Sequence, residues 1–207
     1  MPRKKTDDAC KRLTATAYHE AGHVVARLLL RRPFRYVEIG MPTGELEGIV
    51  KGLPLPSSYH PHVETGGRMR TLVEKEIVIL YAGPEAELHW RRPGAARLAK
   101  MPKLGLRLDD GKVVWVDAPF PDAMVGQLAD SLNDDDHRMS LEEKGAYLKW
   151  LQVRARDLIR EPEHWSMVET IAKALLKHTR LSYAEVRRVI REDNEARFGK
   201  WPKRRER

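Results

Sequence analysis

The residues with the clearest chemistry in this sequence are His19-Glu20-Ala21-Gly22-His23, which match the pattern H-E-x-x-H. In a helix, positions four apart lie on one face about one turn apart, so both imidazoles can bind a single metal ion. Zinc suits this set of groups, because it can lower the pKa of a bound water to about 7 and a glutamate can then take the proton. The pattern predicts a zinc site with His19 and His23 as ligands and Glu20 as general base.

A third ligand has to come from farther along the chain. The short extension typical of metzincins would require glycine at position 26 and histidine at position 29, where this chain has Ala26 and Leu29. A carboxylate from a later helix would make Glu85 or Glu87 the ligand, whereas an aspartate would come from residues 117–136. The alternative to any metal site is a surface helix that carries two solvated histidines.

The element that must position these side chains is a helix over residues 14–31, because its apolar residues recur at three- and four-residue spacing. Residues 36–39 and 48–50 are β-prone and are separated by a Pro- and Gly-containing turn, which predicts a hairpin. Residues 53–67 are expected to form an exposed loop. Another helix is expected from Met69 to Tyr81. Gly83-Pro84 should break this helix and can start a further one. Residues 113–116 are predicted to form a short strand.

The last third of the chain predicts three successive helices. Ser140 with Glu143, and Ser182 with Glu185, match the capping box, in which two side chains satisfy the free amides at the start of a helix. Pro162 marks a third start, because proline is favoured in the first helical turn.

Composition limits the class of protein. The chain has 207 residues, 42% of them apolar, and a formal charge of +8, which is typical of a soluble globular protein. Cys10 is the only cysteine, so an internal disulfide is excluded. No stretch is long enough to span a membrane, and Asp7 and Asp8 stand where a signal peptide would have its apolar core. We therefore expect a cytoplasmic location.

Residues 17–25, Ala-Tyr-His-Glu-Ala-Gly-His-Val-Val, resemble the zinc helix of the FtsH-type ATP-dependent proteases, which read A-Y-H-E-A-G-H. Residues 77–87 are similar to that family's helix ending in G-G-R-x-A-E, and residues 175–186 to its closing helices. The resemblance spans residues 13–192 and implies a peptidase domain between basic tails at 1–12 and 193–207. The implied fold is mainly α with a small β-hairpin or sheet (α+β), in which a zincin-like H-E-x-x-H helix precedes a C-terminal helical bundle.

In the FtsH-type family the third ligand is an aspartate that opens a helix after the G-G-R-x-A-E segment. By the order of helices, the resemblance implies Asp122, which stands before a short apolar run. Asp134, in an Asn-Asp pair like the family's, is the second candidate, and Asp117 is the third. The alternative for each of them is an ordinary acidic residue at an N-cap or in a loop.

The chain departs from that family in having neither a membrane span nor a G-x-x-x-x-G-K-[ST] phosphate loop. The sequence thus predicts a stand-alone zinc metalloendopeptidase that acts on polypeptides, with a separate AAA+ unfoldase and a homo-oligomer as possible partners. A catalytically inactive, zinc-stabilised adaptor is the first alternative. The second is a nucleic-acid-binding protein that uses Arg91, Arg92, Arg97, Lys100 and the basic tail, although no recognition motif accompanies these charges.

Overall fold

The computed structural model describes residues 3–40, 47–53, 67–93, 103–107, 113–117 and 140–199. These residues are mainly helical and include a small three-stranded antiparallel sheet, which confirms the predicted α+β class. The helices are α1 (Arg3–Leu29), α2 (Gly67–Arg91), α4 (Leu141–Arg160), α5 (Pro162–His178) and α6 (Tyr183–Phe198). The strands are β1 (Phe34–Gly40), β2 (Glu47–Gly52), β3 (Lys103–Arg107), β4 (Val113–Asp117) and β5 (Arg180–Ser182). Within the described ranges, no helix is long and apolar enough to cross a membrane.

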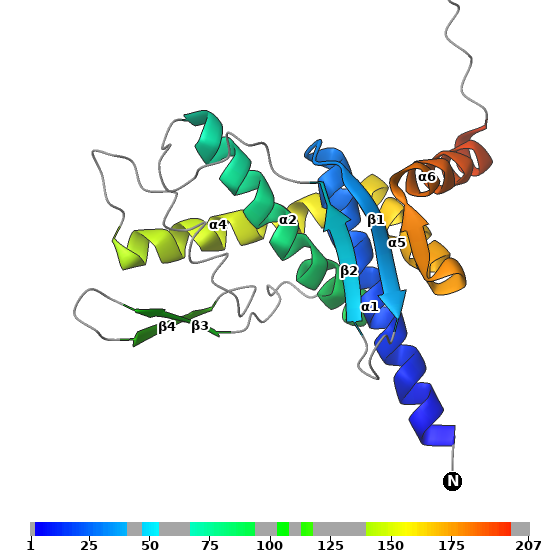
Figure 1. Ribbon diagram of the computed structural model, residues 1–207, viewed down its shortest axis with the longest axis horizontal. Coiled ribbons are helices and arrows are strands. Elements are labelled where there is room, and N and C mark those ends of the chain that lie inside the picture. The colour runs from blue at the N-terminus through cyan, green and yellow to red at the C-terminus, as the bar shows by residue number, and fades with distance from the viewer. Residues whose placement is uncertain are drawn as a thin grey trace, which may run out of the picture.

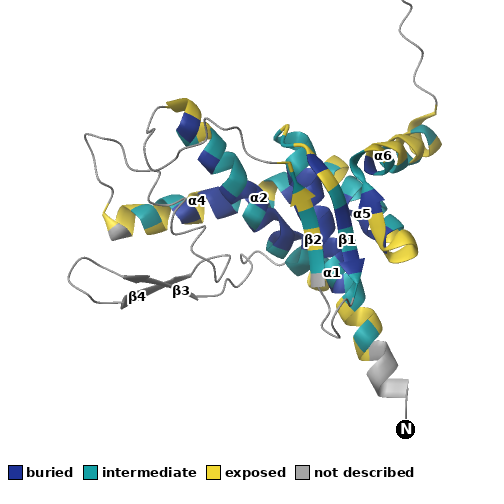
Figure 2. Cartoon of the chain, viewed as in Figure 1, coloured by how far each residue is buried: buried dark blue, intermediate teal, exposed yellow. Residues whose placement is uncertain are grey.

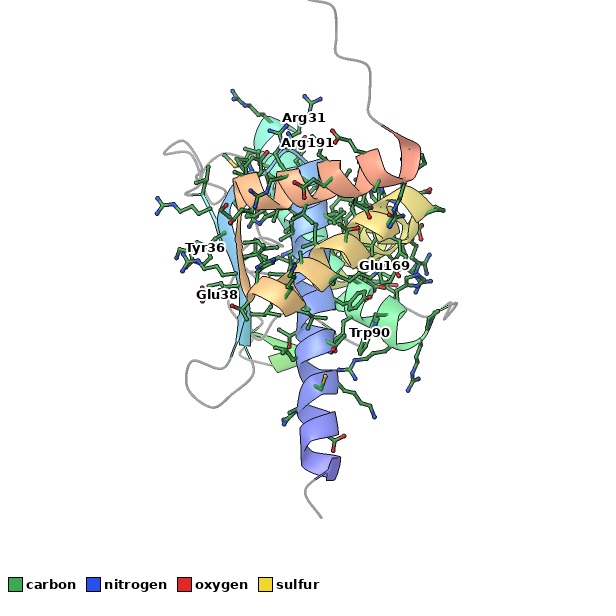
Figure 3. All side chains as sticks on the ribbon, turned by 90° about the vertical axis from the view of Figure 1, so that its right-hand side faces the viewer. Arg31, Tyr36, Glu38, Trp90, Glu169 and Arg191 are labelled. Atoms are coloured by element: carbon green, nitrogen blue, oxygen red, sulfur yellow. The ribbon has the colours of Figure 1, made fainter. Side chains whose placement is uncertain are left out.

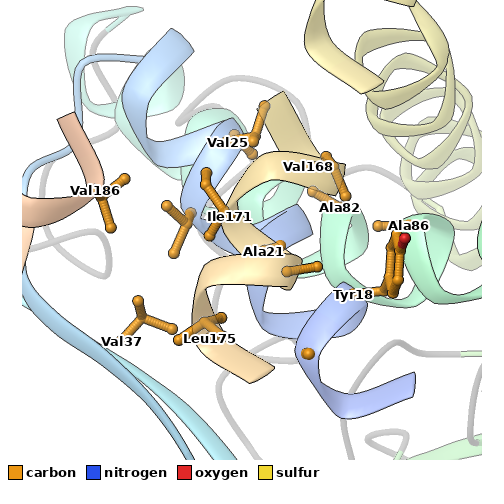
Figure 4. Packing of buried hydrophobic residues seen from close by; sticks show 14 of the residues in the cluster. Tyr18, Ala21, Val25, Val37, Ala82, Ala86, Val168, Ile171, Leu175 and Val186 are labelled. Carbon is orange, nitrogen blue, oxygen red and sulfur yellow. The ribbon is translucent and has the colours of Figure 1, made fainter. Parts of the chain in front are cut away.

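Helix α1 is the central element of the fold (Figure 1). It packs against α2 on one side and α5 on the other, and the sheet covers a third side. Figure 4 shows Ala21 and Val25 of α1 between Ala82 of α2 and Ile171 of α5. Close packing depends on small residues, because a Cβ at Gly22 would lie 2.5 Å from the carbonyl oxygen of Ala82.

Helix α1 begins at Arg3, so residues 3–12 of the basic N-terminal segment expected over residues 1–12 are helical. These residues include no glycine or proline and are rich in lysine and arginine, which favour helix, so the helix continues beyond its packed part. The N-terminal end of α1 projects from the body of the molecule (Figure 1). The buried apolar residues of this helix begin at Ala15. At the other end of the chain, α6 extends to Phe198, past the predicted boundary at residue 192.

Helix α2 is continuous through Pro84, so the predicted break at Gly83-Pro84 is wrong. An internal proline costs a helix about 3 kcal/mol. Burial offsets this cost, because Tyr81, Ala82 and Ala86 around the proline are nearly inaccessible to solvent. Helix α2 lies between α1 and α4, so both of its flanks are packed. Tertiary contacts therefore override the local signal.

The sheet has the strand order β2-β1-β5. The predicted hairpin is confirmed, with Val37 of β1 opposite Val50 of β2. Phe34, Val37 and Ile39 of β1 are buried. Figure 2 shows buried residues along β1, next to the helices. On the opposite face, Tyr36 and Glu38 point away from α1 (Figure 3).

Strand β5 was not predicted, because its three residues lie directly before a helix cap and have no pattern of their own. It pairs with β1 through Leu181 opposite Val37. Both capping boxes are formed, at Ser140 and Ser182, and Pro162 occupies the first turn of α5 as predicted.

Strand β4 matches the predicted strand over residues 113–116 and pairs with β3, which was not predicted. The expected loop over residues 53–67 falls almost entirely outside the described residues, as does the short helix expected after Asp122.

Candidate metal centre

His19, Glu20 and His23 lie on α1 where this helix meets α2 and β2. The two imidazole rings are one turn apart, with centroids separated by 4.9 Å and planes inclined at 76°. Only 5% of Glu20 and 9% of His23 is accessible to solvent. The side chain of His19 is 25% exposed. The burial of His23 is inconsistent with the alternative of a surface helix on which both histidines are solvated.

The imidazole of His23 is oriented by helix α2. Its Nδ1 lies 2.7 Å from the main-chain oxygen of Ile79. A carbonyl oxygen only accepts hydrogen bonds, so Nδ1 carries the proton and the lone pair lies on Nε2. Burial lowers the pKa of His23 to about 3, with the charges of His19 and Arg27 acting in the same direction and the bond to Ile79 against it. The ring is therefore neutral at pH 7, which is the form that binds metals.

Gly83 of α2 provides the space that the His23 ring occupies. A Cβ at this position would lie 2.4 Å from Nε2 and 2.6 Å from Cε1 of His23, far inside a normal contact. Every residue other than glycine would therefore push the ring, and Nε2 in particular, away from its position.

The imidazole of His19 is oriented by Glu87, also on α2, whose Oε2 lies 3.1 Å from Nδ1. Arg91 donates to the other carboxylate oxygen at 2.9 Å. Burial raises the pKa of Glu87, but the hydrogen bond and charge of His19 and the charge of Arg91 outweigh burial, so this pKa lies below its usual range. The ionised carboxylate accepts the Nδ1 proton, so in the neutral form of His19 the lone pair lies on Nε2.

The two glutamates considered as a third ligand have other contacts. Glu87 contacts Nδ1 of His19, which is the position of an orienting partner rather than of a ligand. Glu85 is completely buried on another face of α2 and accepts a hydrogen bond of 2.9 Å from Gln152 of α4. Glu85 is therefore not brought together with His19 and His23.

Glu20 lies beneath strand β2. A Cβ at Gly48 would lie 2.5 Å from both Cγ and Oε1 of Glu20, so the strand passes directly over the carboxyl group. Burial raises the pKa of Glu20 to about 7, although the charge of His19 acts in the opposite direction. A carboxyl group in this environment can take up and release a proton near neutral pH, as a general base requires.

The third ligand predicted from the sequence is not tested by this structure. Asp122 and Asp134 lie outside the described residues, and Asp117 is the last residue of β4, of which only the backbone is described. Among the described residues, no group of three or more histidine, cysteine, aspartate or glutamate side chains could hold one ion.

The donor set nevertheless fits zinc. Each imidazole has its Nδ1 proton bound by an oxygen, one from a carbonyl and one from a carboxylate, and zinc-binding histidines have such partners almost without exception. Sequence reasoning identified the two histidines but missed Glu87 as an orienting residue, as well as Ile79, Gly83 and Gly48. The one sequence feature that could have indicated these residues is the spacing of Gly83 and Glu87, which lie one turn apart on a helix.

The basic residues considered for nucleic-acid binding do not form a cluster within the described part of the chain. Arg91 is engaged with Glu87, and Arg97, Lys100 and the tail from residue 200 lie outside the described residues. Trp90, next to Arg91, stacks on Tyr18 of α1 with ring centroids 5.3 Å apart (Figure 3). Trp150 on α4 is 48% exposed.

We expect Glu87→Gln to weaken zinc binding by about 10- to 100-fold, because an amide is a poorer acceptor for the His19 Nδ1 proton and no longer holds the ring. Zinc affinity would be measured by competition with a chromophoric chelator. Glu142→Gln, the same exchange at an exposed position on α4, is the control. Equal affinities for the wild type and Glu87→Gln would contradict the orienting role.

No protein-family model matches this chain. A search of the curated proteins likewise finds no match.

Proposed function

We propose that this protein is a zinc-dependent metallopeptidase that hydrolyses peptide bonds. The observation that carries the proposal is the matched orientation of His19 and His23, whose Nδ1 protons are bound by Glu87 and Ile79 so that both lone pairs lie on Nε2. A pair of surface histidines has no need of these partners. The resemblance of residues 17–25 to the zinc helix of FtsH-type peptidases supports the same function.

In this proposal His19 and His23 hold zinc, with Asp122 as the third ligand and Asp134 and Asp117 as alternatives. Bound zinc would polarise the peptide carbonyl and lower the pKa of a water molecule. Glu20 accepts the proton of this water and transfers it to the leaving amine. The burial that raises the pKa of Glu20 favours this exchange, because the protonated and ionised forms are then closer in free energy.

Strand β2 is the proposed binding surface for the substrate backbone. Its described partner is β1, and no other described segment pairs with its outer edge. An extended polypeptide can add to such an edge as a further strand. Because Gly48 of β2 lies over Glu20, a peptide on this edge would bring a carbonyl group close to the general base. Extended substrates are favoured, so folded proteins would require a separate unfoldase.

The test of this function is hydrolysis of casein, an unstructured substrate, by the purified full-length chain. We expect hydrolysis that stops when a chelator removes the metal and returns when zinc is added in slight excess. A matched sample that receives magnesium instead of zinc controls for an effect of ionic strength. Hydrolysis that persists in chelator would contradict the proposal. Full zinc occupancy without hydrolysis, even with an unfoldase and ATP present, would favour the inactive adaptor.

A further inference from the structure

Arg27 continues the line of His19 and His23 along α1, one turn beyond His23. Its Nη2 lies 3.5 Å from Oε2 of Glu76 on α2. Arg32 donates from Nε to Oε1 of the same carboxylate at 2.6 Å. The three side chains are only 13–15% exposed, and two guanidinium groups share one carboxylate. The group therefore carries a net positive charge where solvent has little access.

In the described part of the chain, Glu76 is the one carboxylate paired with Arg27, and it is shared with Arg32. The Nε of Arg27 is buried and has no hydrogen-bond partner among the described residues. Burial and the neighbouring charge of Arg32 lower the pKa of Arg27, and Glu76 is the group that opposes them. Arg32 has the shorter contact with Glu76, so the charge of this carboxylate does not neutralise both guanidinium groups. The excess charge indicates that the site accommodates an anionic group.

Strand β2 passes over both the candidate metal centre and the guanidinium group of Arg27. Gly48 and Gly52 both face α1, and each leaves room for a polar side chain of that helix. A Cβ at Gly48 would contact the carboxyl group of Glu20, and a Cβ at Gly52 would lie 3.1 Å from Nη2 of Arg27. Four residues of extended chain cover roughly 13 Å. A peptide on the outer edge of β2 would therefore pass Arg27 about four residues from Glu20.

We propose that Arg27 binds a carboxylate of the polypeptide substrate, about four residues from the bond to be cleaved. The proposal rests on the function proposed above. The carboxylate is either an acidic side chain or the C-terminal carboxylate of a short peptide, because both present two oxygens to the planar guanidinium. Arg27 thus determines specificity and takes no part in the hydrolytic step.

The test measures peptide binding in a Glu20→Gln background, in which bound peptide is not cleaved. The probes are fluorescent ten-residue peptides of neutral residues with blocked ends, in which a single Glu is moved along the chain, and the matching peptides with Gln. A further pair differs only in a C-terminal carboxylate or amide. We expect one position of Glu, or the C-terminal carboxylate, to improve the affinity by about tenfold, the size of one charge-assisted hydrogen bond at a partly exposed site.

Arg27→Gln should abolish this preference while the neutral peptides bind as before, because Arg32 still neutralises Glu76. Arg27→Lys, which keeps the charge, should retain a preference in the same direction and guards against misfolding of the first variant. Arg154→Gln removes one charge from the exposed face of α4 and should leave the preference unchanged.

The carboxylate site is overturned if Glu and Gln peptides bind equally, if no peptide binds, or if Arg154→Gln abolishes the preference as Arg27→Gln does. Its failure is distinguishable from failure of the proposed function. Zinc-dependent casein hydrolysis without a preference for carboxylates rejects the site alone. A preference that depends on Arg27 in a chain that neither binds zinc nor hydrolyses casein supports the carboxylate site and rejects the peptidase.

Discussion

Glu20→Gln is expected to lower casein hydrolysis by on the order of a hundredfold or more while zinc content stays at the wild-type level, because the exchange removes a general base and leaves both imidazoles in place. The glutamine has the same shape as the glutamate and lies in the same space beneath Gly48, so no cavity forms. The melting temperature should therefore change little. The measurement combines initial rates of hydrolysis with zinc analysis of the same samples.

Glu85→Gln is the matched control, because it makes the same exchange at a carboxyl group that is equally buried but contacts Gln152 of α4. We expect this variant to keep both zinc and hydrolysis. Equal rates for Glu20→Gln and the wild type would reject Glu20 as the base. A loss of rate that is accompanied by an equal loss of zinc would instead assign Glu20 to metal binding.

His23→Ala is expected to reduce zinc from about one atom per chain to less than about a tenth, because two remaining protein ligands rarely hold zinc tightly. Alanine also leaves a cavity at this buried position, so the variant loses stability for a second reason. The decisive quantity is the gain in stability on adding zinc. At a thousandfold excess over the dissociation constant, this gain is about 4 kcal/mol for a chain that binds zinc. It should be absent in His23→Ala.

His164→Ala is the matched control for this variant. His164 has the same kind of contact as His23, with Nδ1 2.7 Å from the main-chain oxygen of Leu158, but lies on a different helix. We expect His164→Ala to lose some stability and to retain the gain from zinc. A gain of wild-type size in His23→Ala would contradict the metal site. The same measurement on Asp122→Ala and Asp134→Ala decides between these two residues as third ligand.

Features that depend on residues close in the chain were predictable. The helix that carries His19 and His23 and the capping boxes at Ser140 and Ser182 follow from spacings of three or four residues. The hairpin that contains Val37 and Val50 follows from two β-prone runs joined by a turn. Spacings of three or four residues correspond to one helical turn, so a local pattern specifies a local structure. For this reason His19, Glu20 and His23 could be predicted as site residues from the sequence.

Features that depend on contacts between distant segments were decided by the tertiary structure. Packing holds α2 together through Pro84, and pairing with β1 makes a strand of residues 180–182, although neither segment has a local signal for that structure. The partners of the site have the same origin. Glu87 reaches His19 from 68 positions away in the chain, and Gly48 accommodates Glu20 only because β2 crosses α1. The sequence by itself determined which residues can bind a metal and accept a proton. The tertiary structure decided which atoms of those residues carry the lone pairs, because a hydrogen bond to Nδ1 exists only after α1 and α2 have packed.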